Sequence, residues 1–86
     1  MSKRISLEAA RVLAGLSQKE AAEKFGVNYQ TLASWEKDSN KMKQKYVQMI
    51  PWIYYVNPSE IFFGTKNEFI SYYRNKTQNN NKNNEY

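Results

Sequence analysis

Apolar residues recur at three- and four-residue intervals along most of the chain, a spacing typical of short amphipathic helices. The first set lies between Ser6, a good N-cap, and Gly15. The second set lies between Ser17 and Gly26, and a third follows Asn28. The inward-facing positions of these three predicted helices are Leu7, Ala10 and Leu13 or Ala14; Ala21, Ala22 and Phe25; and Leu32 and Trp35. The amino-terminal half is therefore predicted to contain three short α-helices.

Residues 17–37 predict two helices joined by a tight turn. The Ser17 hydroxyl can cap the first helix while Glu20 reaches back to the Ser17 amide, which is the reciprocal capping box. Gly26 stands where a left-handed residue ends a helix, and Asn28 can cap the next one. Two alanines in the first helix allow the second helix to cross it closely. This pattern predicts a helix-turn-helix.

Two more helices are predicted downstream. The apolar positions of the fourth are Tyr46, Val47, Ile50, Ile53 and Tyr54. Pro51 interrupts this helix, because proline has no amide hydrogen and clashes with the preceding turn. Asn57, Pro58 and Glu60 form a helix start, and Gly64 is expected to end this fifth helix. Residues 66–74 suit a short helix or a short strand equally well.

The chain ends in a polar segment, residues 75–86, that consists of Asn, Gln and Lys with almost no apolar side chains. Such a composition cannot offset the entropy of ordering, so the segment is predicted to be disordered. The fold prediction is one compact all-α domain, residues 1–74, with five helices, a helix-turn-helix at 17–37 and a short additional helix or strand.

Composition narrows the possible functions. The 86 residues include no cysteine and no histidine, so neither an enzyme nor a metal or cofactor site is expected. The net charge of +5 suits a nucleic-acid partner, although a merely soluble basic protein has the same charge. The longest apolar run, 49–56, is too short to span a bilayer, and the basic residues interleave with acidic ones instead of forming a single amphipathic stripe. No membrane partner is expected, and the predicted location is the cytoplasm.

One series of positions resembles the DNA-binding domain of the phage-repressor and Cro type, also called the XRE family, over about residues 5–64. These positions are Leu7, Arg11, Gly15-Leu16-Ser17-Gln18, Ala21-Ala22, Gly26-Val27, Leu32 and Trp35-Glu36. The resemblance implies a bacterial or phage-encoded regulator that binds a near-palindromic operator as a dimer. It also implies that Arg11 pairs with Glu36. The alternative for this pair is two unrelated solvated charges.

The helix predicted at 28–37 would present a polar edge to the bases of the DNA major groove. The candidate base-reading residues are Asn28, Tyr29, Gln30, Thr31, Ala33 and Ser34. Gln30 is the strongest of these, because its amide can donate and accept together at the N6/N7 edge of adenine. Asn28 could equally be only a helix cap.

Six residues are candidates for contact with DNA phosphates: Gln18, Lys37, Asn40, Lys41, Lys43 and Lys45. Gln18 starts a helix, where free amides and the helix dipole favour a phosphate, and the resemblance implies that it also braces Tyr29. The three lysines of 41–45 follow directly on the predicted recognition helix, which would place them beside the DNA backbone. Their alternative is ordinary solvated surface.

The aromatic-rich end of the chain has more apolar side chains than a five-helix core needs. We predict that it contains a dimer contact, with packing inside one chain as the alternative; the residues are Phe62, Phe63, Phe69, Ile70, Tyr72 and Tyr73. The predicted function is therefore a sequence-specific regulator that binds double-stranded DNA as a homodimer, without a small-molecule substrate. A helix-turn-helix adaptor or antitoxin-like module is the alternative.

Overall fold

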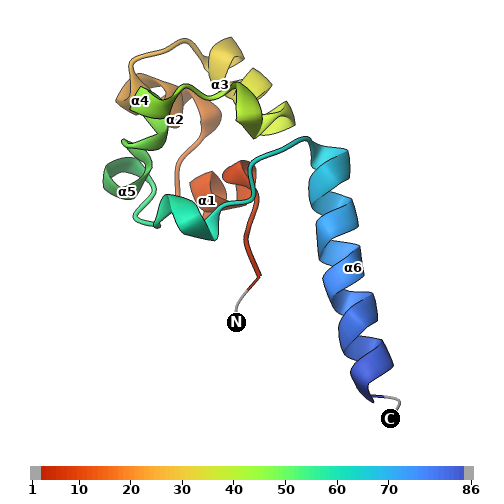
Figure 1. Cartoon of the computed structure of the whole chain (residues 1–86). Helices are drawn as coiled ribbons and strands as arrows, with labels where there is room; N and C mark the ends of the chain where they lie inside the picture. Colours follow the sequence, from red (N-terminus) through yellow and green to blue (C-terminus); the bar gives the residue numbers. More distant parts are fainter. Residues whose placement is uncertain (1–2, 85–86) are drawn as a thin grey trace.

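The computed structural model describes the backbone of residues 3–84 and the side chains of residues 3–75. The elements are α1 (Leu7–Leu13), α2 (Gln18–Phe25), α3 (Tyr29–Lys37), η1 (Ser39–Lys41), α4 (Gln44–Val47), α5 (Ile50–Ile53), η2 (Pro58–Glu60) and α6 (Lys66–Asn84), where η marks a 3-10 helix. The segments from α1 to η2 form a compact body, and α6 extends away from it (Figure 1). The predicted all-α class is confirmed.

The helix-turn-helix forms through the predicted local contacts. The Ser17 hydroxyl accepts a hydrogen bond from the Glu20 amide at 3.1 Å, and the Glu20 carboxylate accepts one from the Ser17 amide at 2.9 Å. Gly26 ends α2 in the left-handed conformation, at φ 78°. Asn28 caps α3 by accepting from the Thr31 amide at 2.8 Å. Both helices thus begin, and α2 ends, where the residue types favour it.

Aromatic side chains fix α3 to the rest of the body. The ring of Phe25 in α2 meets Trp35 of α3 edge to face, with the centroids 5.6 Å apart. Phe25 also packs edge to face on Tyr54, and Tyr46 lies 4.9 Å from Trp35. These rings join a core that also contains Leu7, Ala10, Ala21, Ala22, Leu32, Met42, Ile50, Ile53 and Ile61. Because α3 is held by rings from several elements, its orientation is set by the whole body.

The predicted fourth helix is divided into two short helices, α4 and α5. Pro51 lies in the first turn of α5, where its missing amide hydrogen is tolerated. The proline therefore starts a new helix instead of bending a longer one. Tyr55, just after α5, has a positive φ of 60° and a side chain that is 78% exposed.

The prediction of a fifth helix that ends at Gly64 is wrong in extent. The structure has only the 3-10 turn η2, which ends at Glu60, four residues before Gly64. After Glu60 the chain becomes extended at Ile61, which forms an isolated parallel bridge with Ile5. The Ile5 amide donates to the Glu60 carbonyl, and the Phe62 amide donates to the Ile5 carbonyl, both at 2.9 Å. Pairing with the amino-terminal segment therefore replaces the hydrogen bonds that a longer helix would make.

Residues 66–74, which suited a helix or a strand, lie in α6. A second capping box starts this helix: the Thr65 amide donates to the Glu68 carboxylate at 2.8 Å, and the Thr65 hydroxyl accepts from the Glu68 amide at 3.1 Å. The backbone of α6 runs to Asn84, but side chains after residue 75 lie outside the described part of the chain. The disorder of 75–86 and the domain limit at residue 74 stay predictions.

Candidate nucleic-acid interface

The helix α3 has one buried face and one solvent-facing edge. Leu32 is 0% exposed and Trp35 is 4% exposed, so these two residues hold α3 on the core. The side chains of Asn28, Tyr29 and Gln30 are exposed at the amino-terminal end of the helix, with Tyr29 47% exposed. The remaining predicted base-reading positions are half-buried: Thr31, Ala33 and Ser34. The exposed edge lies at the end of the helix that a helix-turn-helix presents to base edges.

Two polar groups on this edge already take part in hydrogen bonds within the helix. The Asn28 side-chain oxygen accepts from the Thr31 amide at 2.8 Å, which leaves the Asn28 amide group to act as a donor. The Ser34 hydroxyl donates to the Thr31 carbonyl at 2.9 Å and keeps its oxygen as an acceptor. Gln30 is exposed, and an exposed side-chain amide can offer a donor and an acceptor side by side.

Three helices, α1, α2 and α3, meet at a buried ion pair. The Arg11 Nε donates to Glu36 Oε2 at 2.6 Å, and both residues are 9% exposed. The guanidinium also donates to the Leu16 carbonyl at 2.9 Å. The hydrogen bond to Glu36 is the main reason that the pKa of Arg11 is raised, against the opposing effect of burial. The pair joins α1 to the carboxyl-terminal part of α3.

Gln18 belongs to the same network. Its side-chain amide donates to Glu36 Oε1 at 2.9 Å. The bracing of Tyr29 implied by the resemblance stays a prediction, since the described contact of Gln18 is the one to Glu36. One amide hydrogen is used in this bond, and an amide group has two. Because Gln18 is the first residue of α2, it stands at the positive end of that helix.

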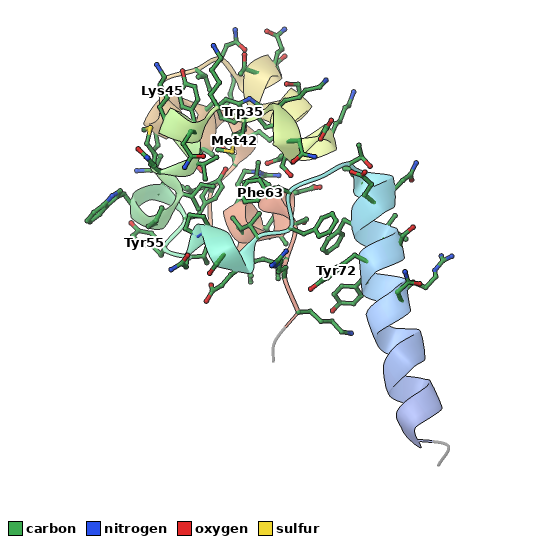
Figure 2. All side chains as sticks on the ribbon, in the orientation of Figure 1. Trp35, Met42, Lys45, Tyr55, Phe63 and Tyr72 are labelled. Atoms are coloured by element: carbon green, nitrogen blue, oxygen red, sulfur yellow. The ribbon has the colours of Figure 1, made fainter. Side chains whose placement is uncertain are left out.

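The lysines of the 41–45 segment come together. Lys41, Lys43 and Lys45 line one open hollow of about 400 Å³, and Thr31 of α3 forms part of its wall. The Lys45 Nζ lies 5.0 Å from the centroid of the Tyr46 ring, and Figure 2 shows Lys45 on the same side of the body as α3. Two further candidates, Lys37 and Asn40, are exposed. This arrangement puts three positive charges next to the amino-terminal half of α3.

The spacing of residues did not reveal every member of this hollow. From the sequence, Tyr46 is predicted to be a core residue of a helix and Val27 to anchor the turn. Both residues also line the hollow with the lysines. Only the fold brings them to the lysine segment. No local signal in the sequence points to this arrangement, because it depends on how α4 crosses α3.

The six predicted dimer residues divide into two groups. Phe62 stacks on Tyr72 with centroids 4.9 Å apart and lies 5.7 Å from Phe69, so these three rings pack within one chain. Figure 2 shows Tyr72 on the side of α6 that faces the body. Phe63 is half-buried against the core. The two exposed members are Ile70, at 49%, and Tyr73, at 45%.

A family model described as helix-turn-helix matches residues 7–50, more than half of the chain. The chain belongs to the XRE-type helix-turn-helix family. This family is one of DNA-binding transcription regulators, and the matched range runs from α1 to the first residue of α5. Searches of curated proteins and of solved structures gave no significant match. Within the described residues, no helix is both long enough and apolar enough to cross a membrane.

Proposed function

We propose that this XRE-type protein is a sequence-specific transcriptional regulator of the repressor or Cro kind, which places α3 in the major groove of double-stranded DNA. The observation that supports this most directly is the exposed amino-terminal edge of α3 beside the three-lysine hollow. An α-helix fits the major groove, where each base pair displays a distinct pattern of donors and acceptors. The protein would act in the cytoplasm of a bacterial cell, on bacterial or phage DNA.

Base recognition is assigned to Gln30 and its neighbours. Gln30 reads an adenine through its N6/N7 edge, and Tyr29 packs on a thymine methyl group or donates its hydroxyl to a phosphate. Thr31, Ala33 and Ser34 complete the reading edge. Asn28 acts mainly as the cap of α3, since its side-chain oxygen is used by the Thr31 amide.

Phosphate contacts come from two sides of α3. The second amide hydrogen of Gln18 and the free amides at the start of α2 hold one phosphate. Lys41, Lys43 and Lys45 hold the backbone next to their hollow, with the remaining contacts from Lys37 and Asn40. Each phosphate that is neutralised steepens the dependence of log affinity on log salt by about 0.9.

We further propose that the regulator binds as a dimer on a near-palindromic operator, with half-sites about one helical turn apart. The exposed residues Ile70 and Tyr73 on α6 supply the contact between copies, together with the apolar groove that they share with Phe69. The other aromatic candidates serve mainly to attach α6 to its own body, as the stacking of Phe62 on Tyr72 supports.

Selection of bound sequences from a random duplex pool tests this function. We expect a symmetric consensus from the full chain. Gln30→Ala should relax the preference at one base position in each half-site, because it removes the proposed adenine contact. Lys43→Ala is the matched control, which should weaken all sequences alike and lower the salt slope by about 0.9. A folded protein that enriches no sequence would instead favour an adaptor or antitoxin-like role.

A further inference from the structure

A second hollow lies between the body and the first turns of α6. It is half-enclosed, measures about 250 Å³, and shares no lining residue with the base-reading edge of α3. Its apolar wall is formed by Leu7, Phe62, Phe69 and Ile70. Its polar wall includes Glu36, at the carboxyl-terminal end of α3. The hollow therefore lies between α6 and the carboxyl-terminal end of α3.

The charged groups of this wall are already matched. Glu8 lies 3.7 Å from the Lys66 ammonium and 3.9 Å from the Arg11 guanidinium. Glu36 accepts hydrogen bonds from Arg11 and from Gln18. A charged ligand would have to displace one of these partners, whereas an uncharged ligand leaves every pair in place. The electrostatics of the wall therefore favour a neutral molecule.

The size of the hollow indicates how large that molecule can be. An engineered apolar cavity of about 150 Å³ holds one benzene ring, so about 250 Å³ has room for a second, fused ring. The side chains of Phe62 and Phe69 offer ring faces and edges to such a molecule. We propose that this hollow is an effector site that binds an uncharged aromatic molecule of two fused rings.

The effect on DNA binding rests on the proposed function. A ring in the hollow covers the part of the Glu36 side chain that solvent still reaches, which is 4% of it, and lowers the local dielectric constant. The hydrogen bond between Glu36 and the Gln18 amide becomes stronger in these surroundings. Gln18 is then held more firmly on Glu36, with its second amide hydrogen fixed for the proposed phosphate contact, so occupancy of the site strengthens DNA binding. We expect a gain of about fivefold, the low end of usual allosteric couplings.

Indole is the probe for a test on the full chain labelled with ¹⁵N. Titration to the solubility limit of indole should shift the amide signals of residues around the hollow: Leu7, Ser39, Phe69 and Ile70. Benzoate and benzylammonium, which are charged, should shift these signals much less. Absence of indole shifts, or shifts centred on another part of the protein, would overturn the site without any variant. Shifts of Leu7 and Ser39, which lie outside the proposed dimer contact, that grow with protein concentration alone would show that a second copy fills the hollow, and would also overturn it.

Two variants sharpen the test. Ile70→Trp fills the hollow and should remove the indole shifts, while Tyr73→Trp, one turn along α6 and outside the wall, should keep them. Both residues are about half exposed, so both substitutions should leave the fold intact. Continued binding of indole in Ile70→Trp would contradict the assignment. If indole binds but DNA affinity does not change, the coupling is wrong and the site stands; if DNA binding is absent without indole, the proposed function fails instead.

Discussion

Removal of Arg11 should strongly destabilise this protein. Arg11→Met keeps much of the side-chain volume but leaves the carboxylate of Glu36, whose side chain is 4% exposed, with only the Gln18 amide as a described partner. Breaking a buried pair by removing one member costs about 3–5 kcal/mol, because the other charge stays buried. Small domains are stable by only about 5–15 kcal/mol, so this loss is a large part of the total.

The measurement is urea unfolding followed by far-ultraviolet circular dichroism, with a double-mutant cycle. Arg11→Met and Glu36→Leu should each lower the free energy of unfolding by about 3–5 kcal/mol. The double variant should recover much of this loss, because an apolar pair replaces two desolvated charges. If both single variants have small effects that add in the double variant, and the urea midpoint of Arg11→Met equals that of the wild type, the 2.6 Å contact between Arg11 and Glu36 does not contribute this stability.

Three further substitutions test other parts of the fold. Tyr54→Phe should raise stability by about 1 kcal/mol, because the buried Tyr54 hydroxyl has no hydrogen-bond partner among the described residues. Burial also raises the pKa of Tyr54 above its ordinary 10.0. Above pH 10 the tyrosine therefore ionises in the unfolded chain first, and the free energy of unfolding of the wild type should fall by up to about 1.4 kcal/mol per pH unit. The free energy of unfolding of Tyr54→Phe should lack this contribution to the pH dependence. Gly26→Ala should cost about 1–2 kcal/mol in urea unfolding, since φ is 78° and no neighbouring atom would clash; a neutral result would place the turn elsewhere. Tyr55→Asn should gain up to about 1 kcal/mol at a φ of 60°, and a loss of stability would reveal packing by this exposed ring.

The helix-turn-helix was predictable because its signals are local. Ser17 and Glu20 satisfy each other's backbone amides within one turn, and Gly26 adopts a conformation that other residues avoid. Pro51 also acted locally, since it can only begin a helix or break one. Such contacts join residues a few positions apart, so the residue types suffice to place them.

The carboxyl-terminal part was harder to predict because distant segments compete for its hydrogen bonds. The strong start at Asn57 gives only a 3-10 turn, since the following backbone pairs with Ile5. Ser39, an ordinary residue of a polar loop in the sequence, is 3% exposed and accepts from the Gly64 amide at 2.9 Å. Neither partner can be deduced from the residues nearby.

The residue types alone determined the three amino-terminal helices, the turn at Gly26 and the polar edge of α3, because capping and helical spacing act over a few positions. Tertiary structure decided which charges meet. It joined Gln18 to Glu36, gathered the lysines around Thr31, left Ile70 about half exposed and turned Tyr72 toward the body. The physical reason is that ion pairs, hollows and exposed faces depend on how helices cross, and crossing is set by packing of the whole core.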